Sequence, residues 1–315
     1  MRALASPASF KGVLSASQAA AALCEGLQAG GADASALPVA DGGEGTAQIL
    51  FAALGGEWRE APVSDPLGRP VSARWLHLAD GRGVVEAAAA IGLPLLSAQE
   101  LDPLRASSRG FGELIDAAVA TGVSGLLLAL GGVATVDGGA GLLSVVASLP
   151  VPAIVLCDVR TVLADAARLY GPQKGASPED VPVLERRLGA IDQLRPFAEL
   201  PGSGAAGGLG AALAALGGEL APGAEAILDV IGFDVQLAGA DLVVTGEGTV
   251  DGTTAEGKAP GAVARRCVAA GVRCVVAGGV VSAPVDGAET RALSGDPSRC
   301  ADDLRALGLE LAKPS

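Results

Sequence analysis

The sequence predicts an α/β fold with room for two domains, and three observations support this prediction. The chain has 315 residues, half of them hydrophobic, so it can bury a sizeable core. Only 3% of the residues are aromatic, and the apolar residues are mainly Ala, Leu and Val, a composition that suits helices packed closely on a sheet. Finally, apolar runs without a helical period, such as residues 126–130, lead into glycine-rich loops and then into helical patterns.

The amino-terminal segment is expected to form a strand, a loop and a helix. Residues 2–6 are mostly apolar, and Ser15 with Gln18 forms a capping-box pattern that opens a helix. Lys11 lies in the loop between them, close to Ser9. A lysine in such a loop could reach an anion as a point charge, although a solvated surface lysine is the plain alternative.

A second strand is expected at residues 36–40, and it ends in the sequence Asp41-Gly42-Gly43-Glu44 before a further helix. Carboxylates at the carboxyl end of a parallel strand occupy the crevice in which open α/β sheets bind ligands. Asp41 and Glu44 could therefore hold Mg²⁺ or a substrate hydroxyl. The alternative is that Asp41 caps the helix and Glu44 interacts with its dipole from the first turn.

The hydrophobic period changes towards two at residues 58–86, which predicts antiparallel strands of a second domain. Glu86 is a charge within an apolar run, and a buried carboxylate requires partners. A helix then leads to the buried strand at residues 126–130 and to the glycine-rich stretch 131–141, GGVATVDGGAG. Five glycines between a strand and a helix could expose N–H groups to a phosphate, or could simply allow close packing.

The second half of the chain repeats this alternation. A strand is expected at residues 151–158, a turn carrying Lys174 follows, and residues 202–210 form a third glycine-rich segment whose role in packing or binding is open. Residues 240–244 predict another buried strand, with Glu247 and Asp251 in the loop after it. Lys258 precedes a helix, a last strand is expected at residues 272–277, and a polar stretch leads to a carboxyl-terminal helix.

Composition excludes several classes of function. A net charge of −13 argues against a nucleic-acid or anionic-membrane surface. The amino terminus shows no signal-peptide pattern and no apolar run is long enough to span a bilayer, so a cytoplasmic location is expected. The five cysteines form no CxxC pair and are expected to be reduced. His77 is the only histidine, which leaves little for a His-based nucleophile system or metal site.

Taken together, these loops carry acidic groups suited to a divalent cation, and lysines and glycines suited to phosphate oxygens. Phosphoryl transfer needs such groups, because its catalysis is mainly positioning and charge stabilisation. The sequence has no GxxxxGK[ST] motif and no GxGxxG motif after its first strand, so neither a P-loop enzyme nor a dinucleotide-binding fold is predicted.

Eight short segments give the chain a family resemblance: SFKG at 9–12, ADGGEGT at 40–46, DGGAG at 137–141, CDV at 157–159, GPQKGA at 171–176, GAAGGLG at 204–210, TGEG at 245–248 and GKAP at 257–260. In these segments and their order, the chain is similar to the bacterial type I glycerate kinases. The resemblance implies phosphorylation of D-glycerate, normally at the 2-hydroxyl, with ATP and Mg²⁺. A homodimer is left open.

The resemblance also implies two α/β domains with the site in the cleft between them. One domain has a parallel, Rossmann- or flavodoxin-like sheet built from both chain ends, here estimated as residues 1–65 plus 235–315. The other is an inserted mixed α/β domain, residues 66–234. The residues carried over as catalytic are Lys11, Asp41 and Asp137. Those expected to bind substrate or phosphate are Ser9, Gly42, Gly43, Glu44, Gly138, Gly139, Lys174 and Lys258. Glu247 and Asp251 are expected near the metal.

The individual roles are hypotheses. Asp41 or Asp137 would orient or deprotonate the glycerate hydroxyl, while Lys11 and Lys174 would meet carboxylate or phosphate. The chain departs from the family pattern at four positions, which are Ala8, Val133, Val136 and Thr249. These departures motivate two alternatives: a catalytically silent relative that binds a phosphorylated metabolite or nucleotide, and a kinase for another short hydroxy acid.

Overall fold

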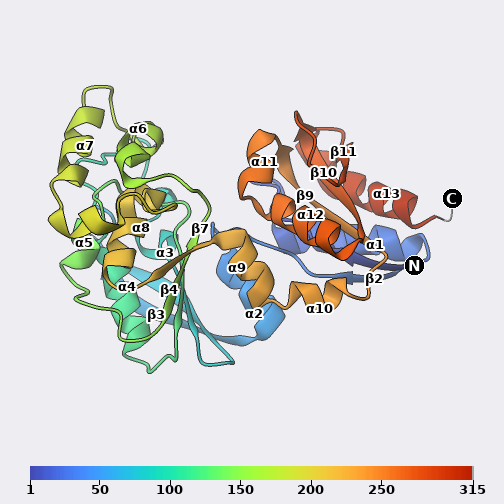
Figure 1. Cartoon of the computed structure of the whole chain (residues 1–315), viewed down its shortest axis with the longest axis horizontal. Helices are drawn as coiled ribbons and strands as arrows, with labels where there is room; N and C mark the ends of the chain where they lie inside the picture. Colours follow the sequence, from blue (N-terminus) through green and yellow to red (C-terminus); the bar gives the residue numbers. More distant parts are fainter. Residues whose placement is uncertain (314–315) are drawn as a thin grey trace. The chain divides into compact units, whose positions relative to one another are not determined.

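The chain folds into two structural units, seen in a computed structural model that describes residues 1–313 apart from the side chains of residues 255 and 256. The terminal unit comprises Met1–Asp41 and the chain from Ala224 onwards, and the inserted unit comprises Gly42–Gly223 (Figure 1). Both junctions precede the expected positions near residues 65 and 235. The first junction lies at Asp41 because the segment that follows packs with the inserted sheet. The second junction lies at Gly223 because the helix that begins there is bonded to the terminal unit.

The terminal unit is built on a five-stranded parallel sheet in the order β11-β10-β9-β1-β2. Its strands are β1 (Arg2–Ala5), β2 (Asp33–Ala36), β9 (Leu242–Val250), β10 (Arg273–Val281) and β11 (Glu289–Ala292). Its helices are α1 (Ala16–Ala29), α9 (Gly223–Val230), α10 (Phe233–Leu237), α11 (Gly252–Glu256), α12 (Ala259–Ala270) and α13 (Cys300–Ala312), with a 3₁₀ turn at Pro297–Arg299.

Helix α1 begins as the sequence predicts, because Ser15 and Gln18 form both bonds of a capping box. It packs against α13 over one face of the sheet, where Leu23, Leu27 and Leu304 join a buried core (Figure 1). The two helices approach closely: a Cβ on Gly26 would lie 2.1 Å from the carbonyl oxygen of Arg305. Glycine is therefore required at this contact.

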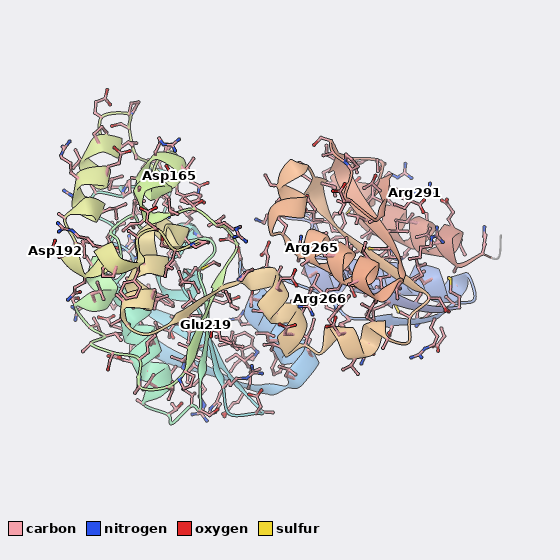
Figure 2. All side chains as sticks on the ribbon, viewed as in Figure 1. Asp165, Asp192, Glu219, Arg265, Arg266 and Arg291 are labelled. Carbon is pink, nitrogen blue, oxygen red and sulfur yellow. The ribbon has the colours of Figure 1, made fainter. Side chains whose placement is uncertain are left out.

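Ionic bonds attach α9 and α10 to α12 in the same unit. The Arg266 guanidinium donates to Glu225 Oε2 at 3.0 Å, to Asp229 Oδ1 at 2.7 Å and to Asp234 Oδ2 at 2.6 Å (Figure 2). Arg265 donates to Glu225 as well, at 2.9 Å. These bonds hold the chain to the terminal unit from α9 onwards.

The inserted unit has a mixed six-stranded sheet in the order β3-β4-β5-β6-β7-β8. Its strands are β3 (Gly56–Ser64), β4 (Pro70–Leu78), β5 (Gly83–Glu86), β6 (Leu126–Ala129), β7 (Ala153–Cys157) and β8 (Glu219–Pro222). Strands β3, β4 and β5 pair antiparallel, as their period predicts, and β5 to β8 run parallel. The structure is therefore α/β, with one parallel and one mixed sheet.

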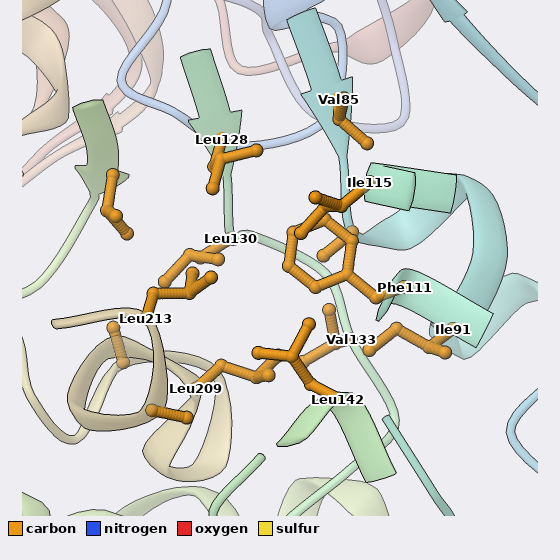
Figure 3. Packing of buried hydrophobic residues seen from close by; sticks show 14 of the residues in the cluster. Val85, Ile91, Phe111, Ile115, Leu128, Leu130, Val133, Leu142, Leu209 and Leu213 are labelled. Atoms are coloured by element: carbon orange, nitrogen blue, oxygen red, sulfur yellow. The ribbon is translucent and has the colours of Figure 1, made fainter. Parts of the chain in front are cut away.

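Short helices cover this sheet. They are α2 (Thr46–Leu54), α3 (Ala88–Ile91), α4 (Arg109–Val119), α5 (Ala140–Leu143), α6 (Ala166–Tyr170), α7 (Val181–Gly189) and α8 (Ala205–Ala215), with 3₁₀ turns at Leu93–Leu95, Leu163–Asp165, Pro172–Lys174 and Asp192–Phe197. Figure 3 shows the resulting core, in which Phe111 and Ile115 of α4 pack near Val85 and Leu142. In the part of the chain that is described, no helix is long and apolar enough to cross a membrane.

Candidate functional site

The terminal unit has a topological switch point between β1 and β9. From β1 the chain passes to β2 on one side, whereas β9, β10 and β11 follow on the other. Open α/β sheets bind ligands beyond the carboxyl ends of the strands at such a point. The loop after β1 is fastened there, because Ala8 N donates to Gly246 O at 2.8 Å and Thr245 Oγ1 donates to Ser6 O at 2.7 Å.

This loop presents Ser9 and Lys11 beside the end of β9. Phe10 is buried and its N–H donates to Leu14 O at 2.9 Å, which anchors the turn. Ser9 is half-buried and Lys11 is exposed. A Cβ on Gly248 would lie 3.6 Å from Lys11 N, so the lysine backbone borders the far end of β9. Lys11 thus occupies the strand-to-helix loop that the sequence predicts.

Glu247 lies within strand β9, and the expectation that it lies in a loop after a shorter strand was wrong. The strand continues to Val250 because β10 pairs along its whole length, with Gly278 opposite Glu247. Its continuation also depends on Gly246, where a Cβ would lie 2.3 Å from Ala277 O. Strand β1 pairs only as far as Val244, so beyond that residue the loop after β1 borders β9.

Thr254 joins the two acidic residues of this unit. Its hydroxyl donates to Glu247 Oε1 at 2.7 Å and accepts from Asp251 N at 3.0 Å. Lys258 Nζ lies 3.6 Å from Glu247 Oε2 and 3.5 Å from Asp251 Oδ1. Because Asp251 caps α11 and Lys258 is the residue before α12, two helix starts fix the cluster.

The electrostatic environments of the two carboxylates differ. Burial raises the pKa of Glu247, the bonds from Thr254 and Lys258 oppose this, and the nearby charge of Asp41 raises it further. The hydroxyl of Thr253 donates to Asp251 Oδ1 at 2.5 Å and lowers the pKa of Asp251. The charge of Asp41 therefore acts on Glu247 within the terminal unit.

In the inserted unit, the loop before α2 packs against the loop after β6. Gly131 N donates to Gly42 O at 3.2 Å, and a Cβ on Gly131 would lie 2.5 Å from the Cα of Gly43. Gly42 has φ +92°, and a Cβ there would lie 2.8 Å from Leu156 O. These glycines serve close backbone packing, and the exposed side chain of Glu44 lies next to them.

At the amino terminus of α2, the carboxylate that accepts hydrogen bonds from the free N–H groups is Glu86 and not Asp41. The helix begins at Thr46 with Gly45 as its N-cap and no side-chain cap bond, so the capping hypothesis for Asp41 was wrong. Ala47 N donates to Glu86 Oε1 at 3.1 Å. Burial raises the pKa of Glu86, and hydrogen bonds from the Ala47 and Gly45 N–H groups act in the opposite direction. The buried carboxylate thus has the partners that it needs.

Asp137 is fully engaged by its surroundings. Its Oδ2 accepts from Ser108 N and Ser108 Oγ, both at 2.8 Å, and from Gly141 N at 3.1 Å. Its Oδ1 accepts from Gly139 N at 3.0 Å. Two N–H groups that the sequence offered to a phosphate are therefore taken by Asp137. Helix α5 has only four residues, from Ala140 to Leu143.

Lys174 is buried, with 3% of its surface exposed, beneath the loop that carries Asp137. Its Nζ donates to Thr135 O at 2.8 Å. Burial lowers the pKa of Lys174 from 10.5 to about 7, and the charges of Asp137 and Asp158 oppose that shift. The Thr135 hydroxyl is also buried and has no hydrogen-bond partner. Lys174 thus supports this loop from below.

The third glycine-rich segment packs against this loop. Gly138 N donates to Gly207 O at 3.0 Å, and a Cβ on Gly207 would lie 2.3 Å from Thr135 O. Ala206, Gly207 and Gly208 have positive φ within α8, which bends the chain towards the loop. This contact favours the packing role over direct binding for Gly207.

Two of the four positions at which the chain departs from the family pattern lie in the same loop, and their apolar side chains face the core. Val133 and Val136 are 2% and 1% exposed and belong to the buried cluster that also holds Leu142 and Leu209 (Figure 3). Their side chains therefore contribute packing. The other two departures lie in the terminal unit, Ala8 half-buried in the loop after β1 and Thr249 exposed on β9.

The site residues expected from the sequence divide between the two units. The terminal unit holds Ser9, Lys11, Asp41, Glu247, Asp251 and Lys258. The inserted unit holds Gly42, Gly43, Glu44, Asp137, Gly138, Gly139 and Lys174. Sequence reasoning missed Thr254, although its position three residues after Asp251 is a capping-box signal. It also missed Ser108, for which the sequence carries no signal.

The carboxylates and thiols of the chain bear on which metal and thiol chemistry it can perform. Among the side chains of residues 1–254 and 257–313, no group of three or more His, Cys, Asp or Glu residues is arranged to hold a metal ion. The five cysteines are free thiols, four of them buried. Glu247 and Asp251 remain a pair of carboxylates, and Mg²⁺ in nucleotide sites commonly uses one or two carboxylates together with phosphate oxygens and water.

Comparisons with known proteins identify the class. The model of the glycerate kinase family matches residues 3–149 and 146–295. The chain is 38% identical over 310 residues to a glycerate kinase of Bacillus subtilis, covering 84% of this chain and 81% of the relative. It is 37% identical over 309 residues to the glycerate 2-kinase of Escherichia coli, with the same coverage.

A solved structure gives the same result. A protein of Salmonella typhimurium LT2, provisionally named glycerate kinase 2, superimposes with a TM-score of 0.85 at 32% identity, covering 99% of this chain and 97% of the other. The chain belongs to the glycerate kinase family.

Proposed function

We propose that this chain transfers the terminal phosphoryl group of ATP to the 2-hydroxyl group of D-glycerate. Membership of the glycerate kinase family and the match to a glycerate 2-kinase support this activity. The observation that carries it is the cluster of Glu247, Thr254, Asp251 and Lys258 at the end of a parallel sheet. Such a cluster offers carboxylates for a cation and a lysine for phosphate oxygens.

In this proposal Glu247 and Asp251 hold Mg²⁺, which would neutralise phosphate charge when bound. The donor set fits, because one carboxylate on β9 and one at the start of α11 are the kind of ligands that Mg²⁺ combines with phosphate oxygens and water. Lys258, which lies within 3.6 Å of both carboxylates, would meet a phosphate oxygen. Thr254 keeps the Glu247 carboxylate oriented throughout.

Asp41 takes the proton from the glycerate hydroxyl, and Lys11 meets the carboxylate or phosphate of the substrates. Asp41 is assigned this role because its charge acts on Glu247, whereas Asp137 is held in the fold by four hydrogen bonds that its oxygens accept. Asp137 and Lys174 instead hold the 131–141 loop, in which the N–H groups of Gly138 and Gly139 are bonded to Gly207 O and Asp137 Oδ1, so these two glycines serve the loop's packing. Ser9 completes the substrate-binding set of the terminal unit.

Two of the four departures from the family pattern no longer support the alternative of a catalytically silent relative. Val133 and Val136 are core residues, so their apolar side chains remove no polar group from solvent-facing surface. Ala8 and Thr249 remain as departures in the terminal unit. We also propose a cytoplasmic location, in keeping with the five free thiols.

Turnover with D-glycerate, ATP and Mg²⁺, followed by coupled ADP release, tests the proposal. Phosphorus NMR of the product distinguishes 2-phosphoglycerate from 3-phosphoglycerate, and a panel of C3 to C5 hydroxy acids tests substrate choice. The matched control is the Lys11→Ala, Asp41→Ala double variant. Wild-type turnover no higher than that of this control would favour the silent relative.

A further inference from the structure

Strand β3 is an edge strand of the inserted sheet. It pairs with β4 on one side, and no strand of the described residues pairs with the other side. Asp65 N donates to Arg69 O at 2.7 Å, in register with the β3–β4 pairing. Because hydrogen-bonded pairs alternate along an antiparallel ladder, the odd-numbered residues of β3 bond to β4. The even-numbered residues therefore direct their N–H and C=O groups outwards.

Only the second half of this edge is protected. Pro62 has no N–H group, and Ser64 N donates to Glu113 Oε2 at 2.7 Å. Proline and covering contacts are the usual means by which proteins prevent an edge from pairing. Within residues 1–313 no backbone bond takes up the outward groups of Gly56, Trp58 and Glu60. Residues 56–60 are named the open edge below.

Three side chains of the open edge are charged, and Arg59 donates to Glu57 of the same strand at 3.0 Å. Glu57 and Arg59 lie on one face, with 70% and 36% of their side chains exposed. On the other face, Trp58 packs with Phe51 of α2 at a ring-centroid distance of 5.9 Å and lies 4.5 Å from the guanidinium carbon of Arg74. A second strand would therefore meet a preformed surface.

We propose that the open edge binds the open edge of a second copy of this chain, antiparallel, with a two-fold axis at Trp58. In this register Gly56 bonds to Glu60 of the other copy, and Trp58 bonds to its own equivalent. Glu57 then lies opposite Arg59, twice by symmetry, and opposite charges across a strand pair are favourable. The interface is isologous, as two-fold symmetry requires.

Charge selects this register over its neighbours. An axis at Glu57, Arg59 or Glu60 would place that residue opposite its own copy, so like charges would face each other. An axis between two residues would pair outward-facing with inward-facing backbone groups and form no ladder. In the proposed register Pro62 lies opposite the chain just before Gly56 of the second copy, where that copy's β3 begins. The pairing therefore ends at Pro62. The open edge is thus complementary to itself in one register.

Sedimentation equilibrium of the full chain over micromolar concentrations tests the proposal. The wild type is expected to dimerise. Glu57→Arg and Arg59→Glu are each expected to weaken the dimer about tenfold or more, because two like-charge pairs replace two opposite pairs. The double variant Glu57→Arg, Arg59→Glu restores opposite pairs and is expected to return most of the lost affinity.

Two further variants separate pairing from folding. Glu60→Pro removes an outward N–H that β4 does not use, so it should abolish the dimer while the midpoint of thermal unfolding stays close to that of the wild type. Glu219→Arg makes the same charge change as Glu57→Arg on β8, the opposite edge of the sheet (Figure 2), and should leave the dimer intact. A monomeric wild type, or a dimer insensitive to Glu60→Pro and to the charge swap, would overturn the proposal.

Discussion

The two units use their charged residues in opposite ways. In the terminal unit, Lys258 meets its two carboxylates at 3.5 and 3.6 Å, and its side chain is 30% exposed. In the inserted unit, Lys174 has only 3% of its surface exposed and Asp137 accepts four hydrogen bonds from the protein. Charges of the first kind can exchange partners for a ligand at little cost to the fold. Charges of the second kind are part of the fold itself.

The largest expected effect is on activity and lies in the terminal unit. Glu247→Gln removes a charge but keeps the size of the side chain, so we expect kcat/KM to fall about 100- to 1000-fold. The free energy of unfolding should change by less than about 1 kcal/mol, because the Thr254 hydroxyl keeps an acceptor. Steady-state kinetics and urea denaturation measure the two quantities. Glu310→Gln on α13 is the control, and a loss of stability that matched the loss of activity would contradict the comparison.

The next effect is on stability and lies in the inserted unit. Asp137→Ala leaves the hydroxyl and N–H of Ser108 and the N–H groups of Gly139 and Gly141 without their acceptor. We expect the free energy of unfolding to fall by about 2–3 kcal/mol, measured by urea denaturation. Asp116→Ala, at an exposed position on α4, is the matched control and should change stability by less than about 0.5 kcal/mol. An unchanged midpoint for Asp137→Ala would show that the loop does not depend on this carboxylate.

The smallest effect, taken over one pH unit, is a pH dependence of stability. The pKa of Lys174 is lowered to about 7 in the folded chain, from an ordinary value of 10.5. Between these values the unfolded chain binds more protons at this residue, so its contribution to stability increases as pH rises from about 7 towards 10.5. The unfolding free energy of the wild type relative to Lys174→Met should therefore increase by up to about 1.4 kcal/mol per pH unit. Denaturation of both proteins at pH 6, 7, 8 and 9 gives the slope, and a difference that does not change with pH would contradict the lowered pKa of Lys174.

Local signals in the sequence predicted much of the fold. The capping box at Ser15 and Gln18 places α1 correctly, and the period of two at residues 58–86 predicts β3, β4 and β5. The buried strand at 126–130 appears as β6. Each of these signals acts within a few residues of the element that it defines, so single-sequence reasoning can detect it.

Other features depend on residues that lie far apart in the chain. Strand β9 runs on to Val250 only because β10 pairs with it, and β11 forms within a polar stretch because β10 offers it a parallel edge. Glu86 meets the start of α2 from another strand. For the candidate site, the sequence identified the charged residues. It could not show that Asp137 and Lys174 are enclosed by the protein whereas Lys258 is accessible, because burial depends on tertiary packing.

The pairing of β1 with β9 has a consequence for how the chain is made. Ala3 lies opposite Leu242, so the innermost strand contact of the terminal sheet joins residues from the two ends of the polypeptide. A ribosome releases the whole of the contiguous Gly42–Gly223 segment before it releases the strand that β1 requires. Strand β1 is thus synthesised before this whole segment and strand β9 after it, so the pairing of the two strands has to wait until the segment has been made.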